Sequence, residues 1–316
     1  MKSMIKQGDK MIKIFKKIFM FVLSVFIVFM AFLFCVGNYL YDYTLNPHSS
    51  KNNGEKIKVN QDSINKNQQW LDDNTQVVSM QSYDDLKLNG YYADNESDVY
   101  IIMVHGYRSD ATSVVAPAKK MIKEGYNVLI PDLRGHGKSE GDFIGMGWID
   151  HIDILDWIDM IIKKNQQAQI VLYGISMGGA TVMNVAGDNP PKQVKAIIED
   201  CGYTNVWDVL YYHLDEEYGW SKSMMFMAEI VTYLRAGYCI KDASPLEQVK
   251  NANLPILFIH GDNDEFVPFS MLDQLYENAG GPKEKLVIKG GSHANNFAVN
   301  PELYYSTICE FIKKYV

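Results

Sequence analysis

Gly174-Ile175-Ser176-Met177-Gly178 decides the fold of this 316-residue chain because of what lies on either side of it. The apolar residues 170–173 precede it and the small residues 179–181 follow it, which predicts a strand, a tight turn and a helix. A serine inside G-x-S-x-G on such a turn is held in a strained backbone conformation with its hydroxyl exposed. The stretch therefore predicts a nucleophile, Ser176, in an α/β fold; the alternative is a glycine-rich turn with an accidental serine.

The first 36 residues have the pattern of a membrane anchor. Six lysines lie within the first 17 residues, and the run 19–36 (FMFVLSVFIVFMAFLFCV) contains no charged residue. A run of this length is enough to cross a bilayer. A cleaved signal peptide is the main alternative, but its apolar region would be shorter and would end at an A-x-A-like site, which this sequence lacks. We therefore expect a basic cytoplasmic segment at 1–17 and a transmembrane helix at 18–40.

Basic residues set the expected orientation of this helix. Six lysines precede the apolar run and two, Lys51 and Lys56, follow it within twenty residues. This asymmetry keeps the N-terminus in the cytoplasm. Tyr39, Tyr41 and Tyr43 are then expected at the outer interface as an aromatic belt. The prediction is a single-pass protein of the cell membrane whose remaining residues lie outside the cytoplasm.

Charge is divided unevenly between the two parts of the chain. The formal charge is −8, and residues 1–36 carry +5, so the remainder carries −13. An acidic soluble part argues against nucleic acid as a partner and against a second attachment to anionic lipids.

The cysteines do not form a recognisable metal or redox motif. Cys35, Cys201, Cys239 and Cys309 include no C-x-x-C pair, so neither a zinc ribbon nor a dithiol site is indicated. We expect them to act as small hydrophobic side chains. A disulfide between Cys201 and Cys239 is allowed by the expected compartment but not supported by spacing.

Composition changes twice along the remaining chain. Residues 44–68 are polar and rich in Asn, Lys, Ser and Gln, which predicts a stalk with some helix, placed at 41–74. Two alternating runs, 75–80 and 86–92, then predict a hairpin.

After the hairpin, apolar strands alternate with helical stretches. The expected strands are 99–104, 128–130, 170–173, 194–198, 256–259 and 286–288. Fully apolar runs of this length favour a parallel sheet covered on both faces, so we expect one α/β domain at 75–316.

One stretch interrupts this alternation. Nearly sixty residues separate the strands ending at Ile198 and starting at Ile256, and residues 203–238 are crowded with aromatic and methionine side chains. A loop of that length without secondary structure is improbable. The sequence therefore predicts an inserted helical cap at about 203–245.

A nucleophilic serine needs a base and an orienting carboxylate, and one candidate for each follows a strand. Asp264 lies beyond the strand 256–259, and His293 lies beyond the strand 286–288. Strand ends of an open α/β sheet converge on one crevice. Asp262 is a rival acid that can instead satisfy backbone donors of its loop, and Glu265 is a weaker third choice.

The remaining component is a pair of donors for the oxyanion. The backbone amide after the nucleophile, that of Met177, is one expected donor, and the loop after the first central strand supplies Tyr107 as the other. The other histidines lie in the stalk, the cap, a helix or H-G turns, and we assign them no proton-transfer role.

Five motifs in order resemble a known family. They are VHGY at 104–107, PDLRGHGKS at 131–139, YGISMGG at 173–179, HGDNDEFVP at 260–268 and GGSH at 290–293. The set resembles the serine-hydrolase branch of the α/β-hydrolase superfamily and is similar to its bacterial esterase, monoacylglycerol-lipase-like and serine aminopeptidase groups. The resemblance covers 75–316 and favours Asp264 as the acid. It implies a mostly parallel eight-stranded sheet with helices on both faces, a cap after the sixth strand, and no cofactor or metal.

The expected activity is hydrolysis of uncharged acyl or aromatic esters through a Ser176, Asp264 and His293 triad. The expected partners are a small-molecule acyl substrate and, through the N-terminal helix, the membrane. An amidase or peptidase with the same triad is the alternative within enzymes, and a non-catalytic surface binding protein is the alternative outside them.

Overall fold

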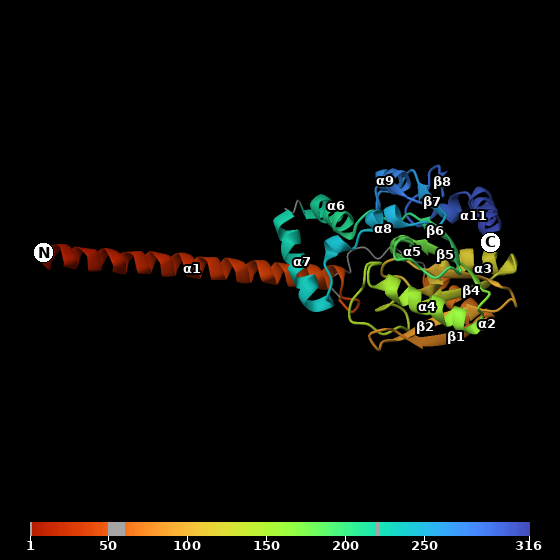
Figure 1. Ribbon diagram of the computed structural model, residues 1–316, viewed down its shortest axis with the longest axis horizontal. Coiled ribbons are helices and arrows are strands. Elements are labelled where there is room, and N and C mark those ends of the chain that lie inside the picture. The colour runs from red at the N-terminus through yellow and green to blue at the C-terminus, as the bar shows by residue number, and fades with distance from the viewer. Residues whose placement is uncertain (1, 50–60, 219–221) are drawn as a thin grey trace.

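One long helix projects from a body built around a single sheet (Figure 1). The computed structural model describes residues 2–49, 61–218 and 222–316. The long helix is α1 (Lys2–Thr44), and the body contains all the strands.

The sheet has eight strands in the order β1-β2-β4-β3-β5-β6-β7-β8. They are β1 (Gln76–Gln81), β2 (Lys87–Ala93), β3 (Val99–Val104), β4 (Asn127–Pro131), β5 (Gln169–Ile175), β6 (Val194–Asp200), β7 (Ile256–Gly261) and β8 (Lys283–Ile288). The hairpin β1–β2 and the pair β2–β4 are antiparallel, and every other pair is parallel. The eight-stranded, mostly parallel sheet expected from the sequence is confirmed.

Helices cover both faces of this sheet, so each central strand buries alternate side chains in two cores. On β3, Ile101 and Met103 join one core, while Ile102 and Val104 join the other. The first core lies under α2 (Gln61–Asn74), α3 (Val115–Lys123) and α11 (Pro301–Tyr315). The second lies under α4 (Asp150–Lys164), α5 (Met177–Gly187), α8 (Pro245–Asn251) and α9 (Ser270–Asn278). Strands buried on both faces explain why their sequences are continuously apolar.

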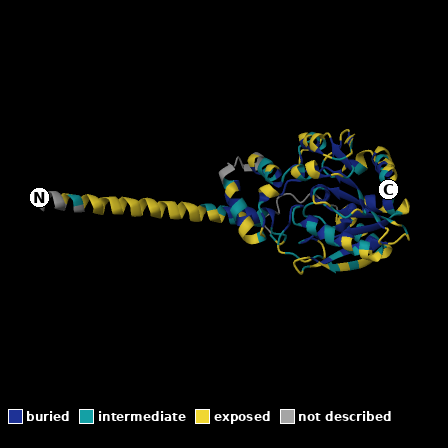
Figure 2. Ribbon diagram, viewed as in Figure 1, coloured by how far each residue is buried: buried dark blue, intermediate teal, exposed yellow. Residues whose placement is uncertain are grey.

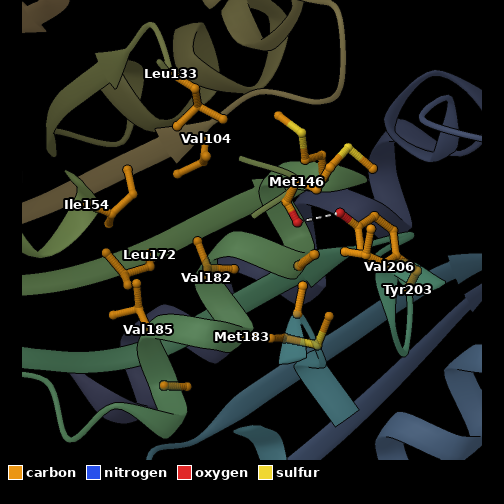
Figure 3. Close-up of a cluster of buried hydrophobic side chains, with 14 of the residues drawn as sticks. Val104, Leu133, Met146, Ile154, Leu172, Val182, Met183, Val185, Tyr203 and Val206 are labelled. Atoms are coloured by element: carbon orange, nitrogen blue, oxygen red, sulfur yellow. Dashed lines mark hydrogen bonds between the residues drawn. The ribbon is translucent and has the colours of Figure 1, made fainter. Parts of the chain in front are cut away.

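The second core extends beneath the loop that precedes α4 (Figure 3). There Val182 and Met183 belong to the same buried cluster as Met146 and Tyr203. The buried hydroxyl of Tyr203 donates a hydrogen bond of 2.8 Å to the carbonyl of Met146, so the start of the cap is fixed to the main body by a satisfied polar contact.

Part of the expected stalk is a helix that packs on the body. Residues 50–60 of the stalk lie outside the described residues, but 61–74 form α2. Leu71 is fully buried, and the Asn67 side chain donates to the Thr112 carbonyl at 2.9 Å. The sequence showed little apolar periodicity here because polar side chains supply much of the contact.

The cap comprises two helices, α6 (Val206–Tyr218) and α7 (Lys222–Ala236), followed by the short helix η3 (Ile240–Asp242). They fall within the range expected from the sequence. In Figure 1, α7 lies at the end of the body from which α1 projects and runs across α1.

Helix α1 is exposed along most of its length but enters the body at its C-terminal end (Figure 2). Its segment Lys10–Thr44 is the one candidate membrane span among the described residues, and an 18-residue window within it has a mean hydropathy of 3.0. A transmembrane anchor and a signal sequence both fit that finding. Leu40, Tyr41 and Leu45 are buried, so Tyr41 packs inside the protein rather than in the expected aromatic belt.

We call the contact between the end of α1 and α7 the α1–α7 seam. It joins Gly37, Tyr41 and Asp42 to Val231 and Arg235. A Cβ on Gly37 would lie 2.6 Å from the Met227 carbonyl oxygen, so only glycine allows the two helices to approach this closely. The Arg235 guanidinium pairs with Asp42 at 2.9 Å and lies 4.0 Å above the Tyr41 ring.

Candidate active site

Ser176 lies on the turn between β5 and α5, as the sequence predicts. Its φ of 57° is unusual for a residue with a side chain. The surrounding glycines are required, because a Cβ on Gly174 would lie 2.1 Å from the Gly178 carbonyl oxygen, and one on Gly178 would lie 2.1 Å from that of Val104. The Ser176 amide donates to the Asp200 carbonyl at 2.8 Å, which fixes the strained turn to the next strand.

The structure brings the three predicted side chains into one hydrogen-bonded line. The Ser176 Oγ and His293 Nε2 atoms are 2.8 Å apart, and His293 Nδ1 is 2.8 Å from Asp264 Oδ2. With the proton on Nδ1, His293 donates to Asp264 and its Nε2 accepts from the serine hydroxyl. Ser176 and Asp264 are buried, while the His293 side chain keeps 16 % of its surface exposed.

Asp264 is held as a carboxylate by its surroundings. Burial alone would raise its pKa, but hydrogen bonds from His260 and His293 outweigh burial and bring the pKa well below its usual range. Its second oxygen accepts the amides of Phe266 and Val267, both at 2.9 Å. A fixed negative charge therefore faces the imidazole of His293 at neutral pH.

The rival acids do not join this line. Asp262 accepts the Gly290 amide at 2.6 Å and so closes its own loop, as the alternative in the sequence analysis anticipated. Glu265 is exposed. Of the three carboxylates in this loop, only Asp264 bonds His293 among the described residues.

The loop after β3 lies against the serine, where the second oxyanion donor is expected. A Cβ on Gly106 would sit 3.4 Å from the Ser176 Cβ, so the loop passes directly beside the Ser176 turn. Tyr107 follows Gly106, and Met177 follows Ser176 at the first position of α5. The structure thus places both proposed donors in segments that border the serine.

This loop also contacts the end of α1, a contact that no sequence pattern predicts. The Tyr107 hydroxyl donates to the Thr44 carbonyl at 2.7 Å. Arg108 donates to the Tyr107 hydroxyl at 2.8 Å and to the carbonyls of Tyr43 and Asn46 at 3.1 Å each. A guanidinium at the C-terminal end of α1 satisfies carbonyls that lack partners within the helix.

Two histidines in H-G turns are structural, as expected. His105 Nε2 accepts the Leu133 amide at 3.0 Å, and His136 Nε2 accepts the Arg108 amide at 3.1 Å. Burial lowers the pKa of His136 to about 3, so it stays neutral and can accept. Both rings shape the loops around the site without reaching the serine.

His260 is the functional candidate that the sequence analysis missed. It is fully buried at the end of β7, and its Nε2 lies 3.3 Å from Asp264 Oδ2 and 3.1 Å from the Val267 carbonyl. Burial opposes its protonation, but Asp264 and the nearby Glu199 outweigh burial and raise its pKa. The signal was available in the sequence, because His260 and Asp264 are four residues apart around one tight turn.

Aromatic side chains connect the cap to the triad. The Phe266 ring lies 4.7 Å from the His293 ring and 4.3 Å from the ring of His213 on α6. The cap therefore borders the exposed edge of the His293 imidazole through an apolar ring.

Asp264 and His293 also belong to a group of three potential metal ligands. Ligand atoms of Cys201, Asp264 and His293 lie within 4.8 Å of one another. Burial raises the pKa of the Cys201 thiol well above its usual value, so the thiolate that binds metals is disfavoured. Both other groups are already engaged in hydrogen bonds, and this cluster does not fit a metal centre.

A buried serine that is hydrogen-bonded to an imidazole, which is itself hydrogen-bonded to a carboxylate, is the arrangement that activates a hydroxyl for attack on a carbonyl.

The comparisons with known proteins point to hydrolases. Residues 95–208 match the family model described as serine aminopeptidase, S33. The chain is 30% identical over 239 residues to the uncharacterized protein YqkD of Bacillus subtilis, covering 75% of this chain and 77% of that one.

Solved structures share the fold. The Pyrococcus furiosus esterase Pf2001 superposes with a TM-score of 0.65 at 24% identity, over 78% of this chain and 93% of the esterase. The Pyrococcus horikoshii acylaminoacyl peptidase superposes with a TM-score of 0.56 at 22% identity, over 76% of this chain and 41% of the peptidase. The chain belongs to the α/β-hydrolase superfamily and is a hydrolase.

Proposed function

We propose that the chain is a membrane-anchored serine hydrolase that cleaves uncharged carboxylic esters. The observation that carries the proposal is the line Ser176–His293–Asp264, with both contacts at 2.8 Å. Because the three side chains already contact one another at the ends of parallel strands, the nucleophile is positioned before substrate arrives. This removes much of the orientational cost of the reaction.

The proposed reaction proceeds in two halves. Ser176 Oγ attacks the ester carbonyl carbon while His293 Nε2 takes its proton, and Asp264 stabilises the resulting imidazolium. The amides of Tyr107 and Met177 donate to the oxyanion. His293 then protonates the leaving alcohol as the acyl-enzyme forms. A water molecule, deprotonated by His293, attacks the acyl carbonyl, and the acid leaves as Ser176 regains its proton.

The anchor in this proposal is α1. Residues 11–32 of α1 are all exposed, and six lysines precede the apolar run. Both features favour a helix that stays in the bilayer with the body outside the cytoplasm. The signal-sequence alternative is disfavoured because no A-x-A-like cleavage site follows the apolar run.

Uncharged esters are the proposed substrates because the groups bordering His293 are apolar. Phe266 and the cap helix α6 approach the site from one side. The soluble part also carries −13, which repels anionic substrates at long range.

A fluorophosphonate probe tests the nucleophile. We expect the full-length protein in detergent to be labelled at Ser176, and Ser176→Ala to remain unlabelled with an unchanged unfolding temperature. Ser306→Ala, an exposed serine on α11, is the matched control and should label normally. A folded wild-type protein that resists the probe would refute the assignment.

A second candidate function, amide or peptide hydrolysis with the same triad, is favoured by the family model and by the likeness to an acylaminoacyl peptidase. A panel of matched p-nitrophenyl esters and p-nitroanilides separates the two. We expect kcat/KM to favour the esters and to rise with acyl length. A higher kcat/KM for the anilides would replace the esterase proposal with the peptidase one.

A further inference from the structure

Cap helix α7 carries an exposed apolar stripe beside α1. The stripe comprises Phe226, Ile230, Tyr233 and Leu234, of which Phe226, Tyr233 and Leu234 are 55%, 59% and 65% exposed. Spacings of four, three and one residues place all four on one face of a helix. Large apolar side chains gathered on one exposed face mark a surface that contacts something apolar.

The orientation of the stripe follows from the burial of its neighbours. Val231 contacts α1 at Gly37, and Ala228 and Thr232 are buried. At 100° per residue, Ala228 and Thr232 lie on the side of α7 opposite the centre of the stripe. The stripe thus faces away from the body. Because α7 lies at the end of the body from which α1 projects (Figure 1), this is the side toward the apolar part of α1.

The height of α7 along α1 follows from the seam. The uncharged run of α1 spans residues 19–36, about 27 Å at 1.5 Å per residue, which matches the hydrocarbon thickness of a bilayer. Helix α7 packs tightly on α1 at Gly37, the next residue. A bilayer that contains this run would therefore end at the level where α7 crosses α1.

We propose that α7 is an interfacial helix whose stripe inserts into the membrane surface on the side where α1 emerges. The inference rests on the proposed membrane anchor and is independent of the proposed chemistry. A tyrosine among aliphatic and phenyl side chains suits the headgroup boundary, where amphipathic rings are favoured.

The partner is the lipid surface rather than a second copy of the chain. A stable dimer buries about 800 Å² on each subunit. Large side chains contribute roughly 200 Å² each when fully buried. Because the side chains of the stripe are already about half buried, the four of them together offer less area than a stable dimer needs. The attachment is apolar, so it does not conflict with the −13 charge, which disfavours anionic lipids.

Spin-label accessibility in phosphatidylcholine vesicles tests the proposal on the full-length chain. Cys35→Ala and Cys239→Ser remove the accessible thiols, since Cys201 and Cys309 are buried. Single cysteines are then introduced as Leu234→Cys on the stripe, Phe26→Cys within α1 and Glu302→Cys on the exposed surface of α11. Collisions with oxygen and with a water-soluble nickel complex report the depth of each nitroxide.

We expect the label at 234 to collide more with oxygen than with nickel, at a depth between those of the labels at 26 and 302. A label at 234 that matches the one at 302 overturns the proposal while leaving the anchor intact. A label shielded from both reagents shows a protein partner, such as a second copy, and also overturns it. A water-exposed label at 26 refutes the anchor and the proposal together, and fluorophosphonate labelling reports separately on the chemistry.

A functional readout uses the stripe variant Phe226→Ser with Leu234→Ser. Hydrolysis of a long-chain ester embedded in the same vesicles should fall several-fold, with hydrolysis of dissolved p-nitrophenyl acetate unchanged. Val299→Ser with Leu303→Ser is the control, because these exposed apolar residues lie near the start of α11. Equal rates for the stripe variant and the control on the embedded ester would contradict the proposal.

Discussion

The triad and the α1–α7 seam are two precise arrangements built in different ways. The triad side chains stand at or just beyond the ends of β5, β7 and β8, and each is fixed by hydrogen bonds within its own turn or to the next one. The seam joins residues nearly two hundred positions apart, through a glycine contact and the ion pair of Arg235 with Asp42. Local turns dictate the first arrangement, and the packing of distant helices dictates the second.

The largest expected effect breaks the triad alone. His293→Ala removes the base, and kcat for a p-nitrophenyl ester should fall by about 10⁴–10⁶-fold. The unfolding temperature in detergent should change little, because the side chain is partly exposed. A variant that keeps more than a hundredth of wild-type kcat would show that another group takes the proton.

Arg108 tests whether the end of α1, at the seam, affects the activity of the triad. Arg108→Ala removes the bonds that tie the Tyr107 loop to the end of α1. We expect kcat to fall by roughly 10-fold, since small displacements of an oxyanion donor are costly. Arg108→Lys should restore little, because one ammonium cannot replace the planar guanidinium. Full activity in both variants would show that the loop is held without α1.

Gly37→Leu breaks the seam directly. The new side chain meets the Met227 carbonyl and Val231, so the free energy of unfolding should fall by about 1–3 kcal/mol. Gly8→Leu is the matched control in the same helix, where an added Cβ has nothing within 4 Å. Thermal unfolding of both variants in detergent is the measurement, and equal unfolding temperatures would show that the seam adds no stability.

The smallest expected effect is the pH dependence of folding stability that comes from Glu199, a buried carboxyl near the triad. Burial raises the pKa of Glu199 to about 8, although His260 and the Gly202 amide oppose the shift. Between about pH 4.3, its unfolded pKa, and pH 8, the folded chain binds more protons than the unfolded chain, so stability falls as pH rises. Glu199→Gln should therefore flatten this decline between pH 5 and pH 8.

Thermal unfolding from pH 5 to pH 8 measures that slope. Asp150, whose pKa burial raises to about 7, should leave part of the decline in place. Glu302→Gln, an exposed carboxyl on α11, should reproduce the wild-type slope. Parallel curves for Glu199→Gln and wild type would show that Glu199 does not titrate in this range.

The features that the sequence predicted are those set by local turns, and the features it did not predict depend on the packing of distant segments. The eight strands, the serine turn and the order of Ser176, Asp264 and His293 were predictable because each lies in a short pattern with a local physical cause. The packed helix at 61–74 was not, since its contacts come from amide side chains such as Asn67 as much as from Leu71. Tyr41 was assigned to a membrane interface because nothing in the sequence indicates that Arg235 lies over its ring.

His260 lies between these cases. Its distance from Asp264 in the sequence was visible, but an H-G dipeptide at a strand end also occurs as a plain turn. Burial separates the two interpretations, and burial depends on how β6 and β7 pair. The residue became recognisable only after the sheet was assembled.

The continuous helix α1 has a mechanical consequence. It runs unbroken from Lys2 to Thr44, and Leu45 is already buried in the body, so no joint separates the projecting rod from the folded part. With α1 in a bilayer, any change in thickness that tilts the helix would turn the whole body by the same angle. Membrane thickness would thereby set the direction in which the carboxyl ends of the strands, where Ser176 lies, face.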